Sequence, residues 1–205
     1  LEEVLIGIRR IPHVEIIRIG TRVPVVLPQR VDDELCNMLS KYGPIWLNTH
    51  FNHPRELTPE AAKACDRLLR AGLPVNNQSV LLKGVNDSAA VQKALCQGLL
   101  RAKVRPYYLF QCDTVQGTEH FWTPLETGVQ ILEAMRGFTS GLAVPTYVVD
   151  LPNGGGKIPV GPNYIMARDG DGYMVRNYQG QVSHYRNPAL SAEPSELIRQ
   201  EKVLA

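Results

Sequence analysis

The sequence predicts an α/β protein built around a mainly parallel β-sheet. Short runs rich in β-branched residues alternate along the chain with segments whose apolar residues have helical spacing. The connections between these segments are short and regular, which favours a barrel, or part of one, over an open sheet. Polar residues follow several predicted strands, and in such folds the chemistry lies at that edge of the sheet.

Local signals predict each element. The predicted strands lie within residues 14–24, 45–54, 74–87, 104–113 and 143–150. The predicted helices occupy residues 32–43, 58–72, 88–103 and 123–137, and an amphipathic helix followed by a turn opens the chain. The expected helix caps are Asp32, Thr58 before Pro59, Asp87, and a capping box of Thr123 with Glu126.

The C-terminal part has a different pattern. Residues 163–185 alternate apolar and polar side chains around the turns "RDGDG" and "YQGQ", which predicts a small antiparallel meander. Residues 191–205 are expected to form a terminal helix or a frayed tail. We therefore expect two domains: residues 1–160 form part of a (β/α) barrel with a cofactor-binding loop, and residues 161–205 form the meander and tail.

Composition excludes several function classes. The net charge is +2 and the lysines and arginines are dispersed, so neither nucleic acid nor a membrane is an expected partner. The uncharged apolar segment 138–149 is too short to span a bilayer, and the acidic start does not predict a secretory leader. The chain begins with leucine, inside what resembles the middle of a helix, so we expect its true N-terminus upstream.

The four cysteines are Cys36, Cys65, Cys96 and Cys112. None lies within four residues of another, so the spacing of a zinc or iron–sulfur site is absent. We expect them to be small core residues in a reducing compartment, which predicts a cytoplasmic protein.

Six polar residues fall at or just beyond the predicted strand ends: His50, Asn52, Gln78, Asn86, Asp113 and Asp150. Because the carboxyl ends of parallel strands meet at one edge, this pattern predicts an active-site rim. The alternative is that polar residues simply begin loops.

The segment "VVDLPNGGGKIPV" places Lys157 directly after three glycines. One interpretation is a flexible surface turn with a solvated charge. The other is a cofactor loop, in which backbone N–H groups approach a phosphate and the lysine forms a Schiff base with an aldehyde such as pyridoxal phosphate. Asp150, seven residues earlier, could balance the charge of a cationic substrate. A nucleotide-hydrolysing P-loop does not match, since Ile158 follows the lysine.

Several motifs, including "NTHFNHP", "YYLFQCD" and "VVDLPNGGGK", resemble the lysine 2,3-aminomutase family of radical S-adenosylmethionine enzymes. The resemblance covers about residues 1–188 and implies a partial (β/α)6 radical-SAM-type barrel, of which the chain would hold the last strands, the third to the sixth. It implies that Lys157 is catalytic and binds pyridoxal phosphate, although Asn153 replaces a glycine that is usual in this loop. It also implies that Asp113 and Asp150 hold the distal ammonium of substrate L-lysine.

The same resemblance implies that His50 and Gln78 contact S-adenosylmethionine. In the implied reaction a 4Fe-4S cluster cleaves S-adenosylmethionine, and the resulting radical lets the amino group of lysine move from C2 to C3. The product would be β-lysine, so the enzyme would be an isomerase of lysine metabolism. The cluster cysteines are missing from this chain and are expected upstream, so the chain alone is expected to hold no metal and to be inactive.

The substrate and the reaction class are less constrained than the fold. In the related glutamate mutase a lysine and an asparagine are expected where this chain has Asp113 and Asp150, and two carboxylates favour a cationic substrate. Arginine would also suit them. The sequence is also compatible with a glutamate aminomutase, a pyridoxal phosphate enzyme without radical chemistry, and a non-catalytic module that retains the fold. The expected partner is a small-molecule substrate, with a homo-oligomer possible; the tail lacks cysteine, so a zinc-joined interface is not expected.

Overall fold

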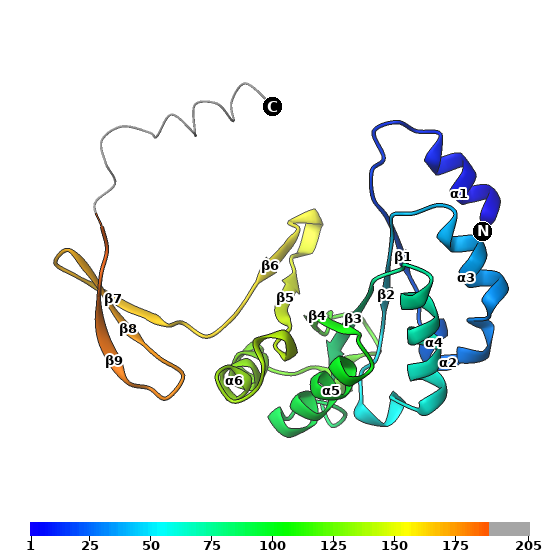
Figure 1. Ribbon diagram of the computed structural model, residues 1–205. Coiled ribbons are helices and arrows are strands. Elements are labelled where there is room, and N and C mark those ends of the chain that lie inside the picture. The colour runs from blue at the N-terminus through cyan, green and yellow to red at the C-terminus, as the bar shows by residue number, and fades with distance from the viewer. Residues whose placement is uncertain (189–205) are drawn as a thin grey trace, which may run out of the picture. The chain divides into compact units, whose positions relative to one another are not determined.

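The computed structural model describes residues 1–188, and the chain divides into two compact units, Leu1–Pro162 and Asn163–Ala205. The first unit is an α/β layer structure around one sheet, and the second contains a separate small sheet (Figure 1). Among the helices of residues 1–188, none combines the length and hydropathy needed to cross a bilayer.

The first unit contains a six-stranded sheet in which spatial order follows chain order. Its strands are β1 (Ile17–Gly20), β2 (Ile45–Thr49), β3 (Val75–Leu81), β4 (Arg105–Gln111), β5 (Thr146–Asp150) and β6 (Lys157–Pro159). The first five are parallel, whereas β6 runs antiparallel to β5. The α/β prediction is confirmed, and the five parallel strands lie within the five predicted segments, one strand more than the four that the resemblance implied.

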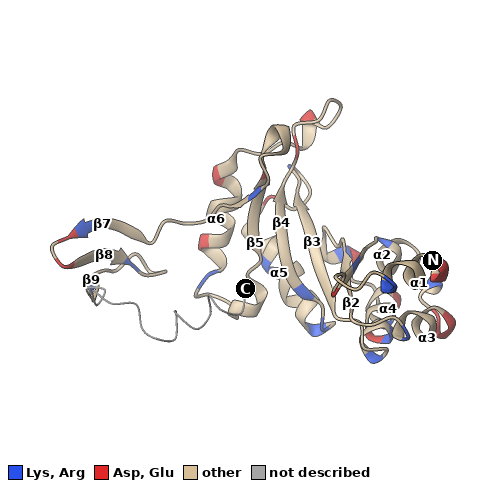
Figure 2. Ribbon diagram, turned by 90° about the horizontal axis from the view of Figure 1, so that it is seen from above, with Lys and Arg blue, Asp and Glu red and all other residues tan. Residues whose placement is uncertain are grey.

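In the first unit one helix precedes β1, and the others lie in the connections between successive parallel strands (Figure 1). The helices are α1 (Glu2–Arg9), α2 (Val23–Val26), α3 (Asp33–Ser40), α4 (Pro59–Arg70), α5 (Ala89–Arg101) and α6 (Leu125–Met135). Short 3-10 turns lie at η1 (Pro28–Arg30), η2 (Pro54–Glu56), η3 (Glu119–Phe121), η4 (Gly141–Ala143) and η5 (Pro152–Gly154). Acidic and basic residues are interspersed along these elements (Figure 2).

Two apolar clusters hold the helices against the sheet. The first joins β1, β2 and β3 to α3 and α4, with Ile45, Leu47 and Leu68 at its centre. The second joins β4 and β5 to α5 and α6, with Leu109 and Tyr147 among its fully buried members. Apolar burial of this kind supplies most of the favourable free energy of folding, so it fixes the positions of the strand ends that carry the candidate site.

The helix caps agree only in part with the sequence. Asp32 and Thr58 do cap their helices, since each side chain accepts a hydrogen bond from a backbone N–H three residues on. The cap of α5 is Ser88 rather than Asp87, because the helix begins one residue later than predicted. The predicted Thr123–Glu126 box does not form: Pro124 occupies the N-cap position, and the buried hydroxyl of Thr123 has no hydrogen-bond partner among the described residues.

The second unit contains the predicted antiparallel meander, with strands β7 (Ile165–Asp169), β8 (Gly172–Arg176) and β9 (Val182–Arg186) in that order. Every side chain of β7 and β9 is exposed, and Gly172 is the buried residue of β8. The terminal helix or tail predicted for residues 191–205 lies outside the described residues.

Candidate active site

An open pocket lies at the carboxyl ends of β4 and β5. Its volume is about 500 Å³, within the range of about 300–1,000 Å³ that is usual for small-molecule sites. Residues 111–115 and 149–152 line it. Asp150 ends β5 and Asp113 follows β4, and because these parallel strands pair directly, both carboxylates reach the same pocket.

The glycine segment after β5 forms a tight reversal of the chain. Asn153, Gly154 and Gly156 have φ angles of 56°, 74° and 81°, in the left-handed region that glycine adopts at little cost. The backbone N–H of Leu151 donates to the carbonyl of Gly156 at 2.8 Å, which closes the turn. The chain then returns as β6, and this return sets Lys157 directly opposite Asp150 in the antiparallel ladder.

The Lys157 amine lies against two side chains, one from β5 and one from β4. Its Nζ forms an ion pair with Oδ1 of Asp150 and lies 4.3 Å from the centroid of the Phe110 ring on β4. The first contact is with a carboxylate, and the second places the amine over the negative face of an aromatic ring. The side chain is 33% exposed, so the amine is neither a freely solvated charge nor sealed from small molecules.

His50 follows β2 directly and is half-buried. Burial lowers the pKa of His50 and the charge of Arg22 lowers it further, whereas a hydrogen bond with the Gln78 backbone acts in the opposite direction. The imidazole is therefore neutral near pH 7. Gln78 lies inside β3, so its predicted place at a strand end is wrong; a register shift in the β3–β4 pairing begins at this residue. Neither residue lines the Asp113–Asp150 pocket.

The side chains of Asn52 and Asn86 form hydrogen bonds with backbone groups instead of contributing to an active-site rim. Asn52 Oδ1 accepts from the Val80 N–H at 2.9 Å, and Asn86 Nδ2 donates to the carbonyls of Asn52 and Val80, both at 2.8 Å. These bonds tie the loop after β2 to the end of β3. At these two positions the structure favours the alternative interpretation, in which polar residues simply begin loops.

Two residues near the site were not predicted as site residues. Phe110 supplies the aromatic face beside Lys157. Asn77 holds both backbone groups of Phe51, accepting from its N–H at 2.7 Å and donating to its carbonyl at 3.0 Å. The available signal was the pair "NN" within a buried strand, where an amide needs partners.

The cysteines do not fit a metal cluster. All four are free and buried, and burial raises the pKa of Cys65 and Cys96 to about 12. A thiol of that pKa is neutral near pH 7, whereas cluster ligands are thiolates. Within residues 1–188 no group of His, Cys, Asp or Glu is arranged to hold a metal ion.

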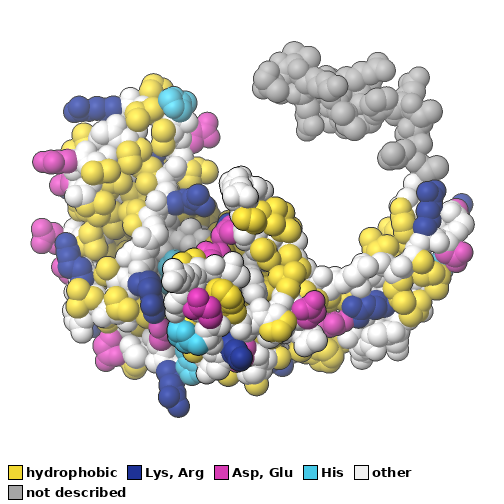
Figure 3. Space-filling model, turned by 180° about the vertical axis from the view of Figure 1, so that it is seen from behind, with side chains coloured by type: hydrophobic (Ala, Val, Ile, Leu, Met, Phe, Trp, Pro, Cys, Tyr) yellow, Lys and Arg dark blue, Asp and Glu magenta, His cyan; other side chains and the backbone are white. Residues whose placement is uncertain are grey.

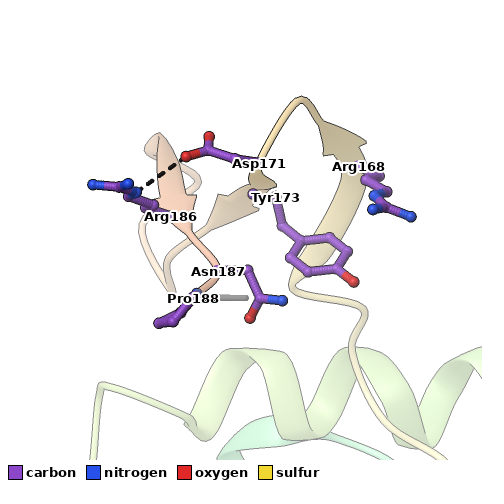
Figure 4. Close-up of a pocket in the computed structure, with 7 residues that line it drawn as sticks. Arg168, Asp171, Tyr173, Arg186, Asn187 and Pro188 are labelled. Carbon is purple, nitrogen blue, oxygen red and sulfur yellow. Dashed lines mark ion pairs between the residues drawn. The ribbon is translucent and has the colours of Figure 1, made fainter. Parts of the chain in front are cut away.

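A second open pocket, of about 750 Å³, lies in the C-terminal unit and contains none of the predicted site residues. Figure 4 shows its two arginines on opposite sides: Arg168 points away on one strand, and Arg186 pairs with Asp171 at 3.1 Å. The guanidinium groups do not converge, so the pocket lacks the arrangement of an anion site. On the face seen in Figure 3, basic and acidic side chains are likewise mixed.

Together, the fold and the first pocket define an α/β protein with a pocket of small-molecule size at the carboxyl edge of a parallel sheet. A family model described as "Lysine-2,3-aminomutase" matches residues 132–200, which include Asp150 and Lys157. Over 92% of its length the chain is similar to "L-lysine 2,3-aminomutase" of Fusobacterium nucleatum (57% identical) and of Clostridium subterminale (55% identical). The chain belongs to the lysine 2,3-aminomutase family.

The chain is also similar to a protein whose name gives a different substrate and, weakly, to one solved structure. Over 89% of its length the chain is 50% identical to "Glutamate 2,3-aminomutase" of Clostridioides difficile. A crystal structure of a radical SAM methyltransferase from Sphaerobacter thermophilus matches 65% of this chain and 40% of its own, with a TM-score of 0.49 and 19% identity. The chain spans less than half the length of the curated relatives, 44%, 45% and 43% of the three named here.

Proposed function

We propose that the chain is part of an isomerase that moves the amino group of L-lysine from C2 to C3 and so produces β-lysine. Its similarity to proteins named L-lysine 2,3-aminomutase supports this activity. The observation that carries the proposal is the shared pocket of Asp113 and Asp150, with Lys157 paired to one of them.

The charge of the pocket favours lysine over glutamate. Asp113 and Asp150 would attract the distal ammonium of lysine and repel the side-chain carboxylate of glutamate. Arginine, also a cation, is the nearer alternative, because its guanidinium would also pair with carboxylates.

The residues present fit the cofactor that the family resemblance implies. Lys157 would hold pyridoxal phosphate, because its part-exposed amine is paired with Asp150, which lines a pocket large enough for a small molecule. When bound, that cofactor supplies a conjugated ring that delocalises an unpaired electron while nitrogen moves between carbons. His50 and Gln78 are the proposed contacts of S-adenosylmethionine; a cluster would need ligands from another part of the protein.

The chain's own residues bind and orient. The two carboxylates fix the far end of the substrate, which fixes where C2 and C3 lie relative to Lys157. Phe110 forms an apolar wall beside the amine and limits the access of water to that side. His50, neutral near pH 7, presents a hydrogen-bonding ring without adding a positive charge to the site.

The experiment is to add pyridoxal phosphate to the intact protein and record the visible absorbance of the lysine-bound cofactor. We expect the band in the wild type and not in Lys157→Ala, because the alanine variant has no amine to attach the aldehyde. Lys41→Ala, which removes a lysine paired with Glu2 outside the pocket, should keep the band. A band of equal size in Lys157→Ala would refute the assignment.

A further inference from the structure

One carboxylate of the pocket already holds a cation. Asp150 Oδ1 is ion-paired with Lys157 Nζ, whereas the side chain of Asp113 has no ion-pair or hydrogen-bond partner among residues 1–188. The proposed binding site for the substrate's distal ammonium is therefore half occupied by the protein's own lysine.

We propose that Lys157 blocks the substrate's cation site until an aldehyde cofactor binds covalently to it, so that the cofactor must be loaded before the cationic amino acid. This inference rests on the proposed function and adds an order of binding to it. It makes Asp150 a shared partner, held first by Lys157 and then by the substrate.

The fold holds the blocking contact in place. The ladder between β5 and β6 sets Asp150 and Lys157 opposite each other, and the closed turn between them leaves little freedom in this register. Phe110 attracts the same ammonium from the β4 side, at 4.3 Å from the ring centroid. A substrate cation that enters the pocket would have to displace Lys157 from both groups, with only Asp113 free to receive it.

Loading the aldehyde removes this competitor. The ammonium of Lys157 first gives one proton to solvent, and the amine then forms a C=N bond to the aldehyde carbon. The carbonyl oxygen leaves as water with the two remaining N–H hydrogens, so atoms and charge balance. The linked nitrogen keeps at most one N–H, against three in the ammonium, and Asp150 becomes available to a new cation.

The inference can be tested without any cofactor. The probe is Nα-acetyl-arginine, a cation whose blocked amine and guanidinium do not react with aldehydes, titrated calorimetrically into the intact, cofactor-free protein. Lys157→Met removes the competing charge and keeps a similar side-chain length. We expect this variant to bind the probe about two- to fivefold more tightly than the wild type, the range that a part-exposed ion pair contributes.

A double-mutant cycle separates competition at Asp150 from a general change of charge. In the Asp150→Asn background, Lys157→Met should change the probe affinity by less than half as much, because the shared carboxylate is gone. Lys83→Met, which removes a charge from the loop after β3, should leave the affinity unchanged in either background. Equal affinity of wild type and Lys157→Met, or an equal gain in both backgrounds, would overturn the inference.

The proposed function has a separate readout. If the wild type shows the absorbance of lysine-bound pyridoxal phosphate while the cycle shows no coupling, the order of binding is wrong and the proposed function stands. If the wild type shows no such absorbance, the assignment of Lys157 fails, and the proposed order fails with it.

Discussion

The carboxylate of Asp113 gives the most direct test at the scale of single residues. It lines the pocket and has no partner among the described residues, so its replacement should leave the fold intact. In the intact enzyme we expect Asp113→Asn to lower kcat/KM for lysine by a factor that corresponds to about 2–5 kcal/mol of lost transition-state stabilisation, because the buried end of a cationic substrate loses one charged partner. Glu34→Gln, on the exposed side of α3, is the matched control and should leave kcat/KM unchanged. Unchanged kcat/KM in Asp113→Asn would remove the charge argument for lysine.

His50 gives a second prediction at this scale, which depends on the sign of its pKa change. Burial first, and Arg22 second, lower the pKa of His50 in the folded protein below its ordinary value. The unfolded chain therefore binds the proton more tightly, so the contribution of His50 to stability is present above about pH 6.5 and is lost as pH falls through the folded pKa. We expect the difference in unfolding free energy between wild type and His50→Gln to decrease from pH 7.5 to pH 5. Arg22→Ala should raise the NMR titration midpoint of His50, and a midpoint above 6.5 in the wild type would contradict the argument.

At the scale of elements, the contact between α6 and β5 depends on one glycine. A Cβ at Gly128 would overlap the ring of Tyr147, which is fully buried and whose hydroxyl donates to Gln111 Oε1. Gly128→Ala should therefore destabilise the protein by about 1–3 kcal/mol, measured by denaturant unfolding, because neither the ring nor the helix can move freely. Gly98→Ala in α5 is the control: there the new Cβ would overlap only the flexible end of the Leu57 side chain, and the gain in helix propensity of about 1 kcal/mol offsets that overlap. Equal losses in the two variants would show that backbone freedom, not the Tyr147 contact, decides the effect.

The elements also show what the sequence predicts well. Helices α3 and α4 and strands β2, β4 and β5 follow from local spacing and caps, and the meeting of Asp113 and Asp150 follows because parallel strands end at one edge. Strand β6 was not predicted, since its three residues have no pattern of their own and are defined by pairing with β5. The pairing of Lys157 with Asp150 depends on this register, and so does the contact with Phe110; both come from long-range geometry that periodicity does not encode.

At the scale of the whole molecule, both apolar clusters lie within the first unit, and their members end at Val160. The described strands of the second unit, by contrast, bury almost no side chains of their own. A chain ending at Pro162 should therefore unfold as cooperatively as the 205-residue chain. Its Tm, measured by calorimetry, should lie within about 3 °C of that of the 205-residue chain, which corresponds to a difference in unfolding free energy of about 1 kcal/mol or less. The peptide 163–205 alone should show no cooperative transition, because a three-stranded sheet whose strands bury almost no side chains is below the size that folds independently. A fall in Tm of more than about 10 °C on truncation would mean that the core of the first unit depends on residues beyond Pro162.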